Sequence, residues 1–198
     1  MLHEFIYDVI LNKNMFKIEK KELRNLRKNR RKIIKKIKFQ NGINPARNWY
    51  IYKDPFIQAF NYVIMSICKI FPPCELKNHL YRLIGAKIGK NVSIANDVIF
   101  DTLFPELIVI EDNVIVGWGT KLYTHEFTQK TTRIGSIILK KNSMIGEWSV
   151  VRPGITIGEN SLISAMSFIN EDVESNTLEG GIPIHIIKHL KNKKFGHT

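Results

Sequence analysis

The stretch "KKNSMIGEWSVVRPGITIGENSLISAMSFINEDVESNT", residues 140–177, decides the fold of this 198-residue chain. Its large apolar residues lie six apart, at Ile145, Val151, Ile157, Ile163 and Ile169. A period of six fits neither the repeat of a helix nor the alternation of a half-buried strand. A short strand and a turn, repeated every six residues, direct each sixth side chain toward one axis. We therefore expect three such units to form one coil, and stacked coils to pair as parallel strands.

The same period runs through the preceding sequence in shorter blocks, separated by a slip of four residues and an insertion of seventeen. The full set of expected ladder positions is Ile88, Ile94, Phe100, Phe104, Ile110, Val116, Leu122, Leu139, Ile145, Val151, Ile157, Ile163 and Ile169. Small residues that suit turns follow several of these positions, at Gly89, Ala95, Gly117, Gly146, Gly158 and Ser164. The period does not fix the hand of the coil, and the general rule for parallel crossovers would make it right-handed.

The chain before the coil follows a helical pattern. A Lys- and Arg-rich segment, Ile18–Phe39, predicts one basic helix, and the Asn-Gly and Asn-Pro pairs after it predict a linker. Two further helices are predicted over Phe56–Phe71 and Glu75–Leu83, ended by prolines and by a glycine. The expected organisation is a basic helical extension and linker over residues 1–54, a helical segment over 55–84 that packs on or caps the coil, an all-β coil over 85–178 with a loop insertion at 123–138, and a C-terminal tail over 179–198.

The positive charge of the chain is concentrated at its N-terminal end. The formal net charge is +12, and residues 1–40 hold thirteen Lys and Arg against four Asp and Glu, a net charge of +9. Such a segment attracts anionic lipid, nucleic acid or an anionic substrate, or forms a solvated helix face. Few aromatic residues are interleaved with these basic residues, and no nucleic-acid motif is present. Peripheral contact with a membrane surface is therefore favoured over nucleic acid.

Cysteine content and hydropathy indicate a cytoplasmic protein. Cys68 and Cys74 form no disulfide framework and match no four-ligand metal spacing, so we expect both to be reduced. The first residues, "MLHEFIYDVILNKN", do not have the pattern of a signal peptide. The longest uncharged apolar-rich run, residues 55–68, is too short to span a bilayer. It is predicted to be a buried helix, and an interfacial helix is the alternative.

The runs "VIVGWG", "SMIGEW", "VVRPGITIGENSLISAMSFI" and "EDVESNTLEGGIPIHII" resemble the hexapeptide-repeat acyltransferases, which include maltose, galactoside and serine O-acetyltransferases and surface-polysaccharide acetyltransferases. The resemblance covers roughly residues 76–190, and "FDTLFPELIVIEDNVIVGWGTKLYTHEF" resembles a subgroup linked to cell-surface glycans. It implies a left-handed parallel β-helix and a homotrimer with each site between adjacent subunits. It also implies transfer of an acyl group from acetyl-CoA to a hydroxyl or amine of a sugar or glycan precursor, without a metal.

Acyl transfer needs a base, a donor for the developing oxyanion and a groove for the thioester carrier. In the family, the catalytic histidine occupies a loop that corresponds to "LYTHEF", where His125 follows ladder position Leu122 at the start of the insertion. An imidazole titrates near neutral pH, so it accepts a proton in an ordinary environment. His125 is therefore the expected general base. Glu126 is expected to orient this histidine or to contact the substrate, and a surface carboxylate without a role in the site is the alternative.

The resemblance also assigns the CoA groove, which in the family runs along the later coils between subunits. The matching positions are Glu147, Ala165, Asn170, His185 and Lys188. Ser164 and Met166 stand where the family usually has glycines, which predicts a narrower path for the pantetheine arm. His185 follows Ile184 where the family usually has Ala and then Lys or Arg, so the grip on the CoA phosphates is expected to rest more on Lys188. Trp118 and Trp148 are expected to stack on a sugar or adenine ring, or to pack in the trimer.

Three other functions fit a coil of this kind less well. A carbonic-anhydrase-like trimer needs three histidines on zinc, and His125 is alone in the coil before residue 185. A fragment of a nucleotide-sugar pyrophosphorylase would carry a glycine-rich nucleotide fingerprint before the coil, and none is present. The alternative that stays open is a non-enzymatic trimeric scaffold whose basic arm binds a membrane surface or nucleic acid.

Overall fold

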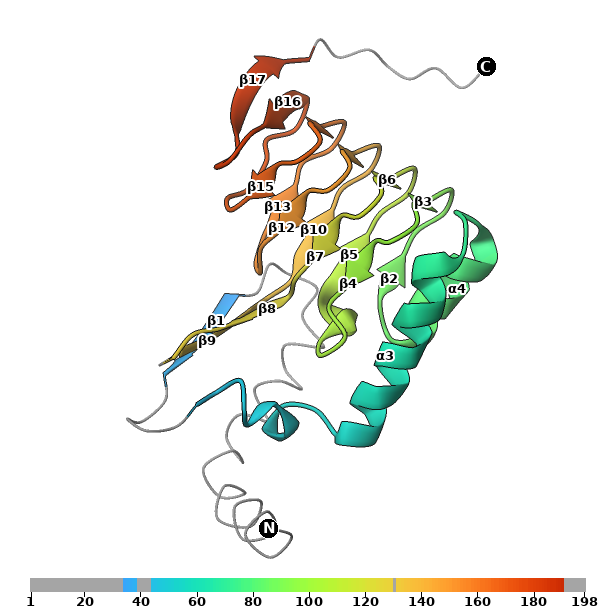
Figure 1. Cartoon of the computed structure of the whole chain (residues 1–198). Helices are drawn as coiled ribbons and strands as arrows, with labels where there is room; N and C mark the ends of the chain where they lie inside the picture. The colour runs from blue at the N-terminus through green and yellow to red at the C-terminus, as the bar shows by residue number, and fades with distance from the viewer. Residues whose placement is uncertain (1–33, 39–43, 130, 191–198) are drawn as a thin grey trace, which may run out of the picture.

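The computed structural model describes residues 34–38, 44–129 and 131–190. Three parallel sheets wind around one apolar core and form the faces of a coil (Figure 1). The first face contains β2 (Lys87–Ile88), β5 (Ile108–Ile110), β10 (Ile137–Leu139) and β13 (Thr156–Ile157). The second contains β3 (Ser93–Ile94), β6 (Ile115–Val116), β11 (Met144–Ile145), β14 (Leu162–Ile163) and β16 (Thr177–Gly180). The third contains β4 (Ile99–Phe100), β7 (Lys121–Leu122), β12 (Val150–Val151) and β15 (Phe168–Ile169).

The six-residue period predicted the core of this coil. Its residues pair in register from one strand to the next and form one apolar column inside each face. The three columns are Ile88, Ile110, Leu139 and Ile157; Ile94, Val116, Ile145 and Ile163; and Phe100, Leu122, Val151 and Ile169. All of these side chains except that of Ile88 are buried. Burial of apolar surface along these columns is the main stabilising term of the coil.

Phe104, the thirteenth expected position, was predicted incorrectly. It precedes a short 3-10 helix, η2 (Pro105–Leu107), which leaves the coil between β4 and β5. Its ring packs in a second apolar cluster with Tyr52, Leu103 and Ile134, away from the three columns. The spacing was misleading because it counts residues along the chain and does not register a segment that leaves the coil and returns.

The turns of the coil use two different solutions to crowding. Gly146 and Gly158 are not in the left-handed region, but a Cβ on either would lie 2.4 Å from a backbone nitrogen of the neighbouring coil. These glycines therefore permit close approach of stacked turns. Positive φ is instead adopted by a column of asparagines, Asn91, Asn113, Asn142, Asn160 and Asn176, with φ between 53° and 59°. Each amide in this asparagine ladder donates a hydrogen bond to the next, over 2.9 to 3.2 Å.

Two helices cover the N-terminal end of the coil (Figure 1). The predicted helices are confirmed as α3 (Pro55–Ile70) and α4 (Glu75–Leu83). Asp54 caps α3 by accepting hydrogen bonds from two backbone N–H groups of its first turn, which a helix leaves free. A preceding 3-10 helix, η1, spans Trp49–Ile51.

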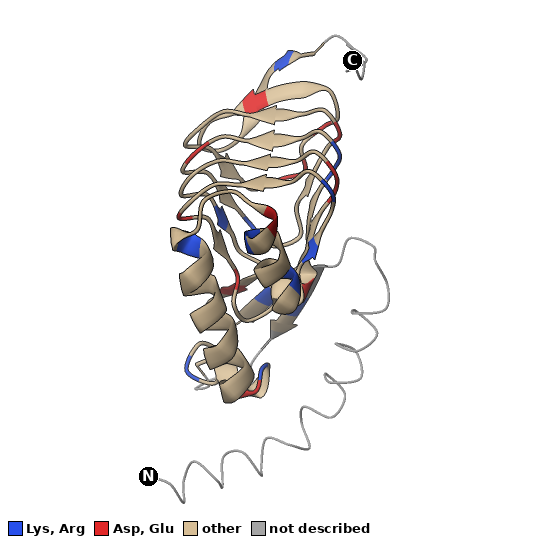
Figure 2. Cartoon of the chain, turned by 90° about the vertical axis from the view of Figure 1, so that its right-hand side faces the viewer, with Lys and Arg blue, Asp and Glu red and all other residues tan. Residues whose placement is uncertain are grey.

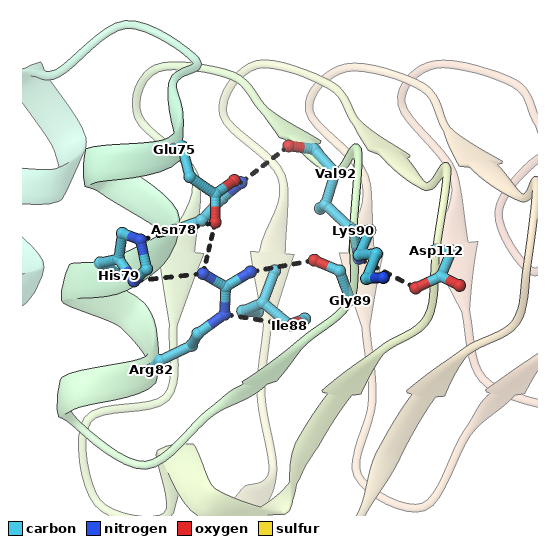
Figure 3. A network of polar contacts seen from close by, with 9 residues as sticks. All are labelled: Glu75, Asn78, His79, Arg82, Ile88, Gly89, Lys90, Val92 and Asp112. Atoms are coloured by element: carbon cyan, nitrogen blue, oxygen red, sulfur yellow. Dashed lines mark hydrogen bonds and ion pairs between the residues drawn. The ribbon is translucent and has the colours of Figure 1, made fainter.

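A polar network attaches α4 to the first coil (Figure 3). Arg82 donates from Nε to Ile88 O over 3.1 Å and from a terminal nitrogen to Gly89 O over 3.0 Å, while Asn78 Nδ2 donates to Val92 O. The buried Lys77 ammonium donates to Phe71 O and Ala95 O, both at 2.8 Å. Side chains of α4 thereby satisfy backbone carbonyls at the open end of the coil, which water would otherwise have to solvate.

The segment predicted as a loop insertion, residues 123–138, forms a β-hairpin. Its strands β8 (His125–Phe127) and β9 (Thr131–Gly135) pair antiparallel, and β1 (Ile34–Lys38) adds a third strand to β9. The prediction of one helix over Ile18–Phe39 is therefore wrong for residues 34–38, and residues 18–33 lie outside the described residues. Pairing with a strand almost a hundred residues away decides the conformation of β1, and local helix propensity does not record such pairing.

At the C-terminal end, the chain continues past the predicted limit of the coil. Strand β16 pairs parallel with β14, and β17 (His185–His189) folds back antiparallel on β16. Residues 179–190, which were predicted as part of a tail, therefore extend one sheet of the coil. Residues 191–198 of that tail lie outside the described residues.

Candidate active site

His125 stands where the chain leaves the coil. Strand β7 ends at Leu122, and the hairpin begins with His125 in β8. The imidazole is half-buried, with an exposed side-chain fraction of 22%. It lies edge-on to two aromatic rings, at centroid distances of 4.7 Å to Phe127 and 6.0 Å to Phe104. The ring is therefore held by packing but keeps an edge open to solvent.

Asp101, which follows β4, faces the imidazole from the preceding coil. Its Oδ2 lies 2.5 Å from His125 Nδ1 and also accepts from the backbone nitrogens of Thr124, at 2.9 Å, and His125, at 3.0 Å. Its Oδ1 accepts from the backbone nitrogen of Leu103 at 2.8 Å. The register of β4 with β7 places Phe100 beside Leu122, so the residues that follow each strand meet at one corner of the coil.

Electrostatics keep this carboxylate ionised. Burial is the largest single influence on Asp101 and would raise its pKa, but the hydrogen bond and charge of His125 and the backbone donors outweigh burial and lower the pKa below its ordinary value. An ionised Asp101 accepts the Nδ1 proton of His125. The remaining ring nitrogen, Nε2, then carries the free lone pair of the imidazole. This arrangement prepares His125 to accept a proton at Nε2.

Glu126 takes part in a different interaction. Arg152, at the corner after β12, donates to its carboxylate over 2.7 Å from Nε and 2.9 Å from a terminal nitrogen. These hydrogen bonds lower the pKa of Glu126. The guanidinium also lies 5.9 Å from the ring centre of Phe168. The carboxylate at Nδ1 of His125 therefore belongs to Asp101, and Glu126 lines the same corner as an ion pair.

The expected site residues occupy two corners of the coil. The first corner follows the strands of the third face and lies beside His125. One residue comes after each strand there, in the order β4, β7, β12 and β15: Asp101, Tyr123, Arg152 and Asn170. Asn170 Oδ1 is buried and has no hydrogen-bond partner among the residues that the structure describes. After the second face, exposed residues follow β6, β11 and β14, namely Trp118, Glu147, Trp148 and Ala165. Trp118 and Trp148 have ring centres 6.2 Å apart.

His185 and Lys188 lie on the exposed strand β17 at the end of the second face. A Cβ on Gly181 would lie 2.6 Å from a ring carbon of His185, which shows how closely this imidazole approaches the preceding turn. Within the described residues, no three His, Cys, Asp or Glu side chains gather as ligands for a metal ion.

Sequence reasoning missed Asp101 and Arg152. Both residues come directly after a ladder position, where most other positions are followed by small or neutral residues. A charged residue at that place is therefore a signal that could have pointed to Asp101 and Arg152. The nine residues between Phe100 and Ile110 leave the coil through η2, so the sequence did not show which later residue Asp101 would face.

Comparison with known proteins agrees with this architecture. Residues 136–171 match the family model described as "Bacterial transferase hexapeptide (six repeats)". The chain is 34% identical over 142 residues to "Putative acetyltransferase YvoF" of Bacillus subtilis (strain 168), which covers 70% of this chain and 83% of the relative. This chain belongs to the hexapeptide-repeat acetyltransferases. Its similarity to the galactoside O-acetyltransferase of Escherichia coli (strain K12) is 30% identity over 93 residues, covering 43% of this acetyltransferase and 46% of the relative.

Two solved structures show the same fold. An acetyltransferase of Vibrio cholerae O1 biovar eltor, complexed with acetyl-CoA, has a TM-score of 0.57 and 22% identity, covering 69% of this chain and 88% of that chain. A maltose O-acetyltransferase of Clostridium difficile 630 has a TM-score of 0.57 and 18% identity, covering 77% of this chain and 100% of that chain. These likenesses confirm the predicted left-handed parallel β-helix.

Proposed function

We propose that this acetyltransferase moves an acetyl group from acetyl-CoA to a hydroxyl or amine group of a sugar or glycan precursor, with His125 as general base. The pairing of His125 Nδ1 with the ionised, buried Asp101 is the observation that carries this proposal. It leaves Nε2 free on the open edge of a half-buried ring, where an acceptor group has access.

In the proposed reaction, His125 Nε2 takes the proton of the acceptor hydroxyl or amine as that atom attacks the thioester carbonyl carbon. The imidazolium that forms is stabilised by the Asp101 carboxylate, whose position is fixed by three backbone N–H groups. Collapse of the tetrahedral intermediate breaks the carbon–sulfur bond, and the imidazolium returns its proton to the departing thiolate. No step in this sequence requires a metal.

The two corners of the coil support a site shared between subunits. His125 and Asn170 lie at one corner, whereas Glu147, Ala165, His185 and Lys188 follow strands of another face. In a homotrimer, the second corner of one subunit faces the first corner of its neighbour. We propose that CoA lies along that seam, with Lys188 near its phosphates and the free Asn170 Oδ1 accepting from its amide groups. The exposed Trp118 and Trp148 rings offer a platform for an adenine or sugar ring.

Calorimetry with acetyl-CoA is the first test. Saturable binding near one site per chain is expected, and His125→Ala should leave this affinity largely unchanged. Release of CoA thiol with trial acceptors such as galactosides, maltose and amino sugars then reports turnover, which His125→Ala should reduce by about 10² to 10⁴-fold. His79→Ala is the matched control. His79 lies exposed on α4, so this variant should turn over acceptors at the rate of the unaltered chain.

The alternative of a non-enzymatic scaffold predicts that acetyl-CoA does not bind up to millimolar concentration. It also predicts that His125→Ala has no effect in any ligand assay. A soluble monomer with full transferase activity would contradict the proposed seam between subunits while leaving the role of His125 intact.

A further inference from the structure

Helix α3 has two apolar sides, and the coil covers one of them. Asn61, Ile64, Met65 and Cys68 are buried against the coil. The opposite side, which we call the outer face of α3, points to solvent. It is formed by residues with large exposed fractions: Phe56 86%, Phe60 48%, Val63 56%, Ile67 39% and Ile70 80%. A helix that packs on a water-soluble core normally shows polar residues on its outward side.

Charge is almost absent from this helix. Lys69, in the last turn, is the one charged residue within Pro55–Ile70, and Figure 2 shows the rest of the α3 ribbon without Lys, Arg, Asp or Glu. Helix α4 adds two further exposed leucines, Leu76 and Leu83, at the same end of the coil. Large exposed apolar residues gathered on one helix face with almost no charge mark an interaction surface.

We propose that the outer face of α3 docks into the interfacial region of an anionic membrane, with the helix lying in the membrane plane. Amphipathic helices bind there by burying an apolar face, and nearby basic residues strengthen the binding through anionic headgroups. The sequence supplies both parts, since residues 1–40 carry a net charge of +9 and fourteen residues, 41–54, separate them from α3. The proposal does not depend on the acetyl-transfer reaction.

A spanning role does not fit these observations. Helix α3 has 16 residues, and no described helix is both long and apolar enough to cross a bilayer. A second copy of this chain is a weaker candidate for the outer face. Two copies of this chain carry a formal net charge of +12 each and repel one another, whereas an anionic lipid surface complements their charge.

Flotation of the full chain with lipid vesicles tests the proposal. Vesicles of mixed phosphatidylcholine and phosphatidylserine should bind the protein, vesicles of phosphatidylcholine alone should bind it much less, and added salt should weaken the binding. The double variant Phe56→Glu/Val63→Glu should bind the mixed vesicles at least tenfold more weakly. Both side chains are exposed, so thermal unfolding should change little. Ile182→Glu places one negative charge on an exposed residue of the turn between β16 and β17, away from α3, and should bind nearly normally.

The outcomes separate the possible occupants. Unchanged vesicle binding by the double variant would overturn the docking face. Absence of binding by the unaltered chain would overturn the membrane proposal, and a change in sedimentation of the double variant would then assign the outer face to a second copy. Turnover with acetyl-CoA and a soluble acceptor is measured separately, so its failure would bear on the proposed function alone.

Discussion

Asp101→Asn tests the central geometry of the site. The substitution keeps the size of the side chain and removes its charge. Asp101 Oδ2 accepts from the nitrogens of Thr124 and His125, and Oδ1 accepts from Leu103 N. A carboxamide has one oxygen, so in either orientation its NH₂ group faces a buried backbone N–H. The orientation that keeps the oxygen in the Oδ2 position retains the acceptor of Thr124 N and His125 N and leaves the Leu103 N–H without one, which costs about 1–3 kcal/mol of folding free energy.

The expected effect on catalysis is larger. A neutral amide no longer stabilises the imidazolium that forms when His125 Nε2 takes a proton from the acceptor. If the NH₂ group lay opposite Nδ1 instead, Thr124 N and His125 N would both lose their acceptor, and the imidazole would be held in the tautomer whose Nε2 has no lone pair. General bases contribute about 10² to 10⁴-fold to rate, so kcat should fall at least about a hundredfold. The affinity for acetyl-CoA, measured by calorimetry, should change by less than about threefold, because Asp101 is buried behind the histidine.

A second measurement distinguishes positioning from general damage. Urea unfolding of Asp101→Asn should give a folded protein whose stability loss matches the single lost acceptor. A folded variant with kcat close to that of the unaltered enzyme would refute the reasoning, because His125 would then act without its carboxylate partner. A loss of acetyl-CoA binding equal to the loss of turnover would also refute it.

Two further predictions concern the scaffold. Burial raises the pKa of the Cys68 thiol from 9.0 to about 11, so between these pH values the unfolded chain loses this proton while the folded chain keeps it, and the free energy of unfolding should fall by up to about 3 kcal/mol as pH rises. Chemical unfolding across this range should show a steeper fall in the unaltered chain than in Cys68→Ala, because the buried Tyr81, whose pKa is also raised, contributes to the fall in both chains; equal slopes would contradict the assignment. Asn142→Ala should lower the free energy of unfolding by about 2 kcal/mol, because alanine is strained at a φ of 58° and because two amide hydrogen bonds are lost. Asn142→Gly loses the same hydrogen bonds without the strain, so its free energy of unfolding should fall by about half as much. Equal losses in the two variants would show that the amide contacts alone carry the effect.

The ladder positions could be predicted because the coil repeats a local unit. Ile145, Val151 and Ile157 each need the same environment, so the sequence repeats the same residue class at the same interval. Phe104 obeyed the interval by chance, because its ring enters a separate cluster under the hairpin. Nothing in the interval distinguishes these two situations.

The candidate site was harder to predict because its parts come from different turns. His125 was found through a family resemblance and its place at the start of the insertion. Asp101 lies 24 residues earlier and meets His125 only through the pairing of β4 with β7. Strand β1 was mispredicted for the same reason, since its partner β9 is far away in the sequence and a Lys-rich segment on its own favours a helix.

The asparagine ladder sets how this scaffold tolerates changes in length. Successive rungs are separated by 22, 29, 18 and 16 residues, yet each amide still meets the next. The longest interval, from Asn113 to Asn142, contains the whole hairpin that carries His125. A segment inserted or exchanged between two rungs therefore leaves the corner of the coil unchanged. The hairpin, which we propose to meet the substrate, is free to diversify, while the amide column preserves the alignment of the coils on either side of it.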